Sequence, residues 1–135
     1  MTTGQNVFDM AIHLMDEQNE SSGATVTEDT TEYRLRSVNI LNVLRHECFQ
    51  FSDTFRGGTD GKRGICKPIA ELSDTLDLDD AVAQGALPYG LASRLLLGEN
   101  DTLADFFEQK FQEMLGKLGK TSPAQFESIP LYYGF

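Results

Sequence analysis

The residues best suited by type to bind a phosphate lie in a glycine-rich stretch, residues 56–67. Its four glycines widen the range of conformations that the backbone can adopt. The stretch also contains four of the chain's 11 basic residues but a single acidic residue, Asp60. A phosphate-binding loop needs glycine amides, a lysine and a fixed spacing, and that spacing is missing. Three residues rather than four separate Gly57 from Gly61, and Arg63 stands where a Ser or Thr would hold magnesium. We therefore predict no nucleotide site in this stretch.

The acidic run before residue 81 has the residue types of a calcium site but not their order. A calcium loop that began at Asp77 would have Ala81 at its fifth position and Val82 where the loop requires glycine. Helix capping explains these carboxylates better, because Asp77 and Asp80 are spaced as an N-terminal cap and complement the helix dipole. We therefore predict no metal at this run.

The remaining candidates for chemistry are scattered. His13 and His46 fall in two different helical patterns, with no nearby cysteine or second histidine to complete a metal site. Cys48 lies in a helical pattern and Cys66 in a loop, without CxxC spacing, so both are expected to be reduced thiols. No Ser-His-Asp arrangement is indicated. The sequence predicts no catalytic residue, no metal and no cofactor, and hence a protein that is not an enzyme.

The net charge narrows the classes of partner. The 135 residues include 11 Lys and Arg against 21 Asp and Glu, a formal net charge of −10. Such a surface repels phosphate backbones and anionic membranes. The first residues show no signal-peptide pattern, and the apolar stretch 81–97 is too short and too interrupted by glycine and proline to cross a membrane. We expect one domain, made in the cytoplasm, without membrane contact.

The stretch 81–97 is predicted instead to be the central helix of the fold. Only Gln84, Ser93 and Arg94 in it are strongly polar, so nearly its whole circumference must be covered by protein. Pro88 should kink or break this helix, since proline removes a backbone donor and clashes with the preceding turn.

A second helix should follow the central one as its antiparallel neighbour after a short turn. Gly98 is expected to end the central helix, and Asn100 or Asp101 to cap the next one. The apolar face of this next helix repeats at helical spacing through Leu103, Phe106, Phe107, Phe111, Met114, Leu115 and Leu118.

Two further helices precede these. The first should start at an Asn6–Asp9 capping pair and run to about Gln18, and the second, expected to be the longest, at Thr30 or Thr31. The apolar stripe of the first comprises Val7, Met10, Ala11, Leu14 and Met15. The stripe of the second comprises Ile40, Leu41, Leu44, Cys48 and Phe51, widened by Tyr33, Val38 and Val43.

The predicted fold is therefore all-α. We expect a small bundle of four main helices with a Pro-kinked central helix and a Gly-rich loop, spanning residues 1–120, followed by an extended tail, residues 121–135. The predicted core includes Leu41, Leu44, Leu91, Leu95, Phe107 and Phe111.

Two segments are candidates for binding a partner. The segment 129–135, IPLYYGF, is too apolar for an ordinary free tail, so either it folds back on its own domain or it docks on a neighbour. The basic loop contacts an acidic partner or DNA, or is only a solvated connection. The candidate partner-binding residues are Lys62, Arg63 and Lys67 in the loop, and Ile129, Leu131, Tyr132, Tyr133 and Phe135 in the tail.

One longer pattern resembles a known family. Residues 78–100 read L-D-D-A-x-A-x-x-A-L-P-Y-G-L-A-x-x-L-L-L-x-E-N, residues 107–114 read F-x-x-x-F-Q-E-M, and a Tyr-Gly pair stands at 133–134. Together with the helix order, this resembles the head–tail connector (adaptor) proteins of tailed bacteriophages and prophages, over most of the chain. The most specific part is residues 87–92, LPYGLA. The glycine-rich basic insertion at residues 57–64 departs from the family pattern.

The resemblance implies a virion protein of the head–tail neck, synthesised in the bacterial host cytoplasm. Subunits of this family form a ring, by resemblance a dodecamer, below the portal protein of the DNA-filled capsid, and meet a downstream neck or tail protein. DNA passes through the channel without specific binding, which an acidic lining favours because it repels phosphates. Two other classes remain open. One is an acidic helical regulator or DNA mimic that binds a basic partner surface, and the other is an enzyme assembled from scattered residues.

Overall fold

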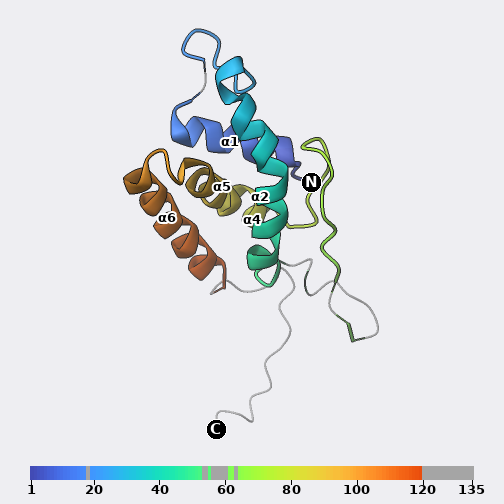
Figure 1. The fold of residues 1–135 in the computed structure, drawn as a ribbon. Helices are drawn as coiled ribbons and strands as arrows, with labels where there is room; N and C mark the ends of the chain where they lie inside the picture. The colour runs from blue at the N-terminus through green and yellow to red at the C-terminus, as the bar shows by residue number, and fades with distance from the viewer. Residues whose placement is uncertain (18, 53–54, 56–60, 63, 120–135) are drawn as a thin grey trace.

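The computed structural model describes residues 1–17, 19–52, 55, 61–62 and 64–119. Within them the chain forms α1 (Gly4–Met15), the 3₁₀ turn η1 (Glu28–Thr30), α2 (Thr31–Phe49), α4 (Asp80–Gly85), α5 (Leu87–Leu96) and α6 (Asp101–Gly119) (Figure 1). These described residues contain no strand beyond a single bridge between Thr3 and Thr75, so the predicted all-α bundle is confirmed. α2 is not longer than every other helix, because α2 and α6 have 19 residues each.

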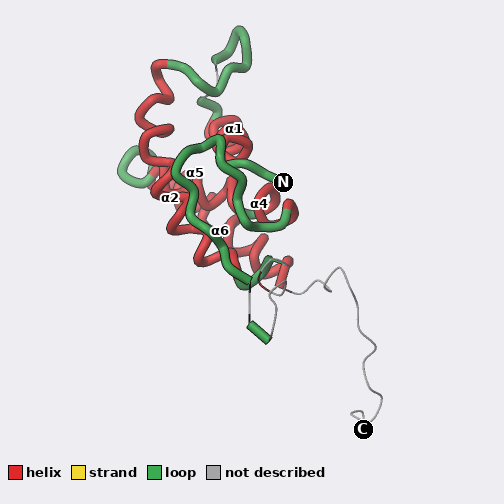
Figure 2. The backbone as a smooth tube through the Cα atoms, turned by 90° about the vertical axis from the view of Figure 1, so that its right-hand side faces the viewer, coloured by secondary structure: helices red, strands yellow, loops and turns green. Residues whose placement is uncertain are grey.

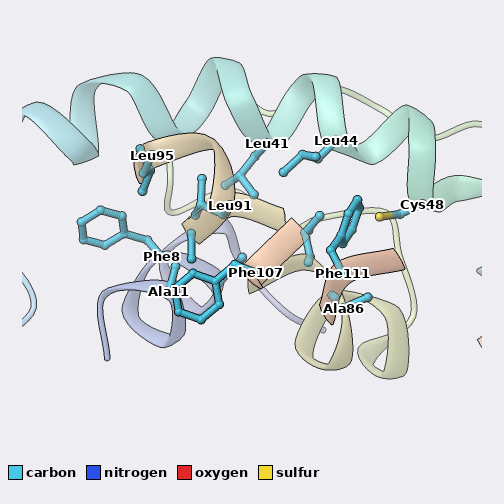
Figure 3. Packing of buried hydrophobic residues seen from close by; sticks show 14 of the residues in the cluster. Phe8, Ala11, Leu41, Leu44, Cys48, Ala86, Leu91, Leu95, Phe107 and Phe111 are labelled. Atoms are coloured by element: carbon cyan, nitrogen blue, oxygen red, sulfur yellow. The ribbon is translucent and has the colours of Figure 1, made fainter. Parts of the chain in front are cut away.

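α5 lies at the centre of the bundle, as predicted for the apolar stretch that contains it. It packs against α6, α1 and α2, and all of its residues except Tyr89 and Arg94 are buried. Figure 3 shows Leu41 and Leu44 of α2 pointing into the same core as Phe111 of α6. A helix covered on all sides needs apolar or small residues around its whole circumference, and nearly all residues of α5 are of these types.

Pro88 divides the predicted central helix in two, as expected. α4 ends at Gly85 and α5 begins at Leu87, so that Pro88 lies in the first turn of α5. Proline is well tolerated there, since the N–H groups of a first helical turn have no acceptor within the helix. The break lets α4 turn away and contact both α1 and α6.

Gly90 is the position where α2, α5 and α6 meet. A Cβ atom placed on Gly90 would lie 3.0 Å from the Phe111 ring and 3.3 Å from Leu44 Cδ1. A Cβ atom on Gly116, in the exposed part of α6, would have no such neighbour within 4 Å. Only the first glycine is therefore required by packing.

Replacing Gly90 with alanine is expected to lower the free energy of unfolding by about 1–3 kcal/mol, because the Phe111 ring must shift to admit a methyl group. Gly116→Ala is expected to raise that free energy by up to about 1 kcal/mol, because alanine is the better helix former. Urea unfolding followed by circular dichroism measures both values. Equal stabilities for the two variants would contradict the packing at Gly90.

Helix capping differs from the prediction at two helix starts. Thr3, rather than Asn6, is the N-cap of α1: its hydroxyl accepts from the Asn6 N–H at 3.2 Å, and Asn6 Oδ1 accepts from the Thr3 N–H at 3.0 Å. Asp79, rather than Asp77, caps α4 by accepting from the Val82 N–H at 2.9 Å. In both places, several polar residues that can cap a helix lie close together in the sequence. The path of the chain decides which one caps the helix.

The turn between α5 and α6 is as predicted. Gly98 has a φ of 87°, in the left-handed region that glycine favours after a helix. Asn100 caps α6 by accepting from the Leu103 N–H at 3.1 Å, and Asp101 Oδ1 accepts from the Gly98 N–H at 2.9 Å. This short turn places α6 directly against α5. The end of α1 was predicted less well, because that helix stops at Met15, before Gln18.

The irregular segment before α4, whose acidic residues were predicted to cap that helix, contributes to the core. The segment packs against the start of α1. The Gly4 N–H donates to the Asp74 carbonyl at 3.1 Å, and the Gln5 N–H donates to the Leu72 carbonyl at 2.7 Å. Figure 2 shows this loop running along one side of the helices. It thus supplies acceptors for N–H groups that have none within α1. Its buried apolar side chains are Ile69, Leu72, Leu76 and Leu78.

The six predicted core residues, Leu41, Leu44, Leu91, Leu95, Phe107 and Phe111, are all buried, so this prediction is confirmed. Four residues of the predicted apolar stripes are exposed instead. Met10 and Leu14 each keep 36% of their surface accessible, Val43 keeps 63% and Phe106 keeps 48%. Helical periodicity alone assigned these four to a covered face, so their exposure marks surfaces that the described residues leave open.

Candidate interaction surfaces

Most of the predicted partner-binding residues lie outside the described part of the chain. Lys62 and Lys67 are described and exposed, and the Lys67 backbone N–H donates to Asp77 Oδ2 at 2.9 Å. The residues outside the described part are Arg63, Ile129, Leu131, Tyr132, Tyr133 and Phe135. The roles assigned to the basic loop and the tail therefore stay predictions.

The titratable side chains of the described residues serve mainly to join elements. No group of three or more His, Cys, Asp or Glu side chains in this part of the chain could hold a metal ion. Burial raises the pKa of Cys48 to about 12, and burial also raises the pKa of the Cys66 thiol, so both are protonated and weakly nucleophilic at neutral pH. The Tyr33 hydroxyl donates to the Glu99 carboxylate at 2.7 Å. Burial first, and this hydrogen bond second, raise the pKa of Tyr33.

The exposed side chains of α1 line a shallow hollow together with α4 and α5. The hollow has a volume of about 380 Å³, in the size range of small binding pockets. Its lining contains no Lys, Arg, Asp or Glu side chain and consists of Met10, His13, Leu14, Gln84, Pro88 and Tyr89.

A second hollow, of about 460 Å³, lies at the start of α6 and is lined by Asn100, Thr102, Leu103 and Phe106. The Phe107 ring connects the two hollows, since its centroid lies 6.3 Å from that of Tyr89 and 5.6 Å from that of Phe106. Most of the lining residues of the two hollows belong to α1, α5 and α6, and α5 lies between the other two helices (Figure 1). We call the surface that they form the apolar strip and define it by Met10, Leu14, Tyr89, Leu103 and Phe106.

The apolar strip lies on the side of α6 that faces away from α2. Arg94 of α5 forms ion pairs with Glu108 of α6 and, at 3.5 Å, with Glu47 of α2. The flank of α6 that carries Glu108 therefore faces α2. Phe106 precedes Glu108 by two residues, which places it about 200° around the helix, on the opposite flank.

A separate uncharged surface lies on α2. Leu35, Asn39, Val43 and His46 follow one another at spacings of four, four and three residues, so they share one face of the helix, which we call the α2 outer face. All four are exposed, Leu35 to 74%, and none is Lys, Arg, Asp or Glu. The buried residues of α2 point the other way, into the core: Tyr33, Ser37, Leu41, Leu44 and Cys48. The described part of the chain thus presents these two uncharged surfaces on different sides.

One end of the bundle is strongly acidic. The hydrogen bond between Tyr33 and Glu99 places the turn between α5 and α6 beside the start of α2. The exposed acidic side chains of this turn, of the start of α2 and of the segment before it are Asp16, Glu17, Glu20, Glu28, Asp29, Glu32, Glu99 and Asp101. Such a concentration of like charge repels phosphates and attracts basic surfaces.

In comparisons with known proteins, no family model, curated protein or solved structure matches this chain. Each helix within the described residues is either too short or too polar to cross a membrane.

Four residues of the apolar strip, Met10, Leu14, Leu103 and Phe106, were predicted from the sequence to lie on apolar helix faces, whereas Tyr89 was named only in the LPYGLA motif. Met10, Leu14 and Phe106 each sit at the edge of a helical stripe, about 36% to 48% exposed. Leu14 and Met10 are four residues apart, as core residues of a helix often are, so spacing could not separate them from Val7 and Ala11. The width of the apolar stripe was a usable signal of exposure, since residues at the margin of a wide stripe are the least covered by the core.

Proposed function

We propose that this chain is a structural, non-catalytic subunit of the neck of a tailed bacteriophage particle, a head–tail connector that forms a ring below the portal. The ring joins the DNA-filled capsid to the tail. It contacts the portal protein on one side and a downstream neck or tail protein on the other, with Lys62, Arg63 and Lys67 of the basic loop as one candidate contact. The sequence resemblance supplies the class of assembly.

The observation that supports ring formation is the pair of uncharged surfaces on different sides of the subunit. A closed ring of identical subunits needs heterologous contacts, in which one patch of a subunit meets a different patch of the next. The α2 outer face and the apolar strip are two surfaces that different neighbouring subunits can cover, because one lies on the outside of α2 and the other on the flank of α6 turned away from α2. Exposed apolar surface in a chain of net charge −10 is expected to be covered in the assembled state.

The acidic end supports the same proposal from electrostatics. A channel through which DNA moves must not hold the phosphates, and carboxylates around it replace attraction by repulsion. DNA then passes without specific binding. The acidic end of the subunit is the part that we assign to the channel side.

Introducing a charge in the α2 outer face is expected to abolish the ring. Val43→Glu places a carboxylate on a 63% exposed position that a neighbour must cover, so the subunit should keep its fold and lose its partner. Mass photometry of the full-length protein, alone and with portal protein, measures the number of subunits. The parent should give a ring mass, by resemblance that of a dodecamer, and Val43→Glu a monomer.

Ala70→Glu is the matched control, because it adds the same charge at an exposed position of the segment before α4, outside both surfaces. It should assemble like the parent. A parent protein that stays monomeric beside its portal would overturn the proposal, as would a Val43→Glu ring of normal mass. An image of the virion neck would place the ring directly.

The acidic end also favours a second candidate function, an acidic regulator or DNA mimic that binds a basic partner surface. Such a protein acts as a monomer or dimer, and its binding weakens as salt screens the charges. The same mass measurement separates the two functions. A stable monomer with tight, salt-sensitive binding to a basic host protein would identify the regulator.

A further inference from the structure

We infer that the apolar strip is the binding site for the C-terminal segment, residues 129–135, of a second copy of this chain. The inference rests on the proposed function, since the second copy is the adjacent subunit of the ring. The residues of the apolar strip have the spacing of a buried helix face, but none of the described residues covers them. The segment of the second copy would provide that cover.

The segment has the pattern of a strand with one apolar face. In an extended chain alternate residues point to the same side, which puts Ile129, Leu131, Tyr133 and Phe135 on one face. Pro130, which cannot donate a backbone hydrogen bond, suits an extended segment that lies on a surface rather than within a sheet. At about 3.3 Å per residue, the six steps from Ile129 to Phe135 cover about 20 Å.

The apolar strip matches this segment in length and in chemistry. Neighbouring packed helices lie about 8–10 Å apart, so the strip spans about 16–20 Å from α1 across α5 to α6. Its two hollows, of about 380 and 460 Å³, can each accept side chains of the segment. Neither the segment nor the linings contain Lys, Arg, Asp or Glu, in a chain that is otherwise highly charged. Burying the two against each other therefore removes no charged side chain from solvent.

The charges on the surface between the end of α6 and the apolar strip favour a second copy as the subunit that provides the segment. Phe106 lies 13 residues before Gly119, about 20 Å back along the helix. The flank of α6 between them carries Lys110, Glu113 and Lys117, at the spacing of one helix face, and Lys110 pairs with Glu113 at 3.6 Å. For the segment to reach the strip of its own subunit, the linker before it would have to run back along these charges. The apolar strip instead runs across the helices, open to a chain that arrives from outside.

The linker is long enough for such an exchange. Nine residues lie between Gly119 and Ile129, and the ten steps from one to the other reach up to about 33–36 Å in an extended chain. That distance exceeds the width of the three helices that form the strip. Each subunit can therefore bind the segment of one neighbour and donate its own segment to another.

Disulfide trapping between two singly substituted full-length proteins tests this assignment. In a Cys66→Ser background, one protein carries Leu14→Cys in the apolar strip and the other carries Tyr133→Cys in the segment. Cys48 is fully buried and stays in place. Under a mild oxidant the mixture should form a disulfide-linked heterodimer. Because binding raises the effective concentration of the two thiols into the millimolar range, we expect it to form at least about tenfold faster than chance collision allows.

Val26→Cys, mixed with the same Tyr133→Cys protein, measures chance collision, because Val26 is 56% exposed and lies outside the strip. Equal rates for Leu14→Cys and Val26→Cys would overturn the inference. So would a chain carrying both Leu14→Cys and Tyr133→Cys that links only to itself while the mixture does not react, since the segment then binds its own subunit. Circular dichroism of each variant checks that the helices are intact.

The trapping result is independent of ring size. If the mixture links across chains but mass photometry of the untreated protein finds only dimers, the segment exchange stands and the ring is wrong. If rings form but Leu14→Cys does not link to Tyr133→Cys, the ring stands and the segment binds elsewhere.

Discussion

Replacing Phe111 with alanine is expected to lower the free energy of unfolding by about 3–5 kcal/mol. Phe111 is fully buried and contacts the point where α2, α5 and α6 meet, next to Gly90. Removing its ring leaves a cavity between three helices, and Gly90 opposite has no side chain that could relax into the space. Urea unfolding monitored by circular dichroism measures the change, which is a large fraction of the stability of a domain of this size.

Phe106→Ala is the matched control on the same helix. Phe106 is 48% exposed and its contacts include Lys110, whose ammonium lies 5.8 Å from the ring centroid. Losing this exposed contact should lower the free energy of unfolding by no more than about 1 kcal/mol. The same variant should weaken assembly, because Phe106 belongs to the apolar strip. Similar losses of stability for the two variants would contradict the division between core and strip.

The helical part of the fold could be predicted because its signals are local. Apolar side chains at helical spacing identify α1, α2 and α6, and the breaks at Pro88 and Gly98 follow from the backbone chemistry of those two residues. The irregular segment that buries Ile69 and Leu72 could not be predicted in the same way. Its burial depends on hydrogen bonds with the start of α1, far away in the sequence, and no periodic pattern records such contacts.

The candidate surfaces could be predicted only in part, for a different physical reason. A helical stripe shows which side chains avoid water, but not whether their cover comes from the same chain or from another one. Phe107 and Phe106 are adjacent in the sequence, and both were assigned to the apolar face of one helix. The first is 4% exposed and the second 48%. Tertiary packing separates them, because Phe107 faces α5 whereas Phe106 lies on the flank that no described element covers.

Arg94 shows the same dependence on tertiary contacts for a charged residue. In the sequence it interrupts an otherwise apolar helix, and nothing nearby in the chain explains it. In the fold its guanidinium pairs with Glu108 of α6 and Glu47 of α2, so one cation joins three helices. A partly buried charge is tolerated when it is paired in this way.

Removing residues 128–135 is expected to abolish assembly while leaving the thermal unfolding of the helices nearly unchanged. The core that the described residues form consists of side chains between Val7 and Leu118, so we expect the helices to stay packed without the deleted residues. Assembly does depend on them, because the four large apolar side chains on one face of the segment are lost: Ile129, Leu131, Tyr133 and Phe135. Each contributes about 1.5–3 kcal/mol when fully buried, before the cost of ordering the segment. Circular-dichroism melting reports the fold, and attachment to portal or tail reports assembly.

Single substitutions make the same test more specific. Tyr133 shares its face of an extended chain with Ile129, Leu131 and Phe135, whereas Tyr132 points to the opposite side. Tyr133→Ser should therefore weaken attachment strongly and Tyr132→Ser much less, although the two changes remove the same side chain. Equal losses would mean that the segment does not bind as a strand with one buried face. A truncated protein that unfolds would show that the segment completes the fold of its own subunit. A truncated protein that still builds complete infectious particles would show that the segment is dispensable. Either result would contradict the prediction, because an assembly contact is needed for attachment and not for folding.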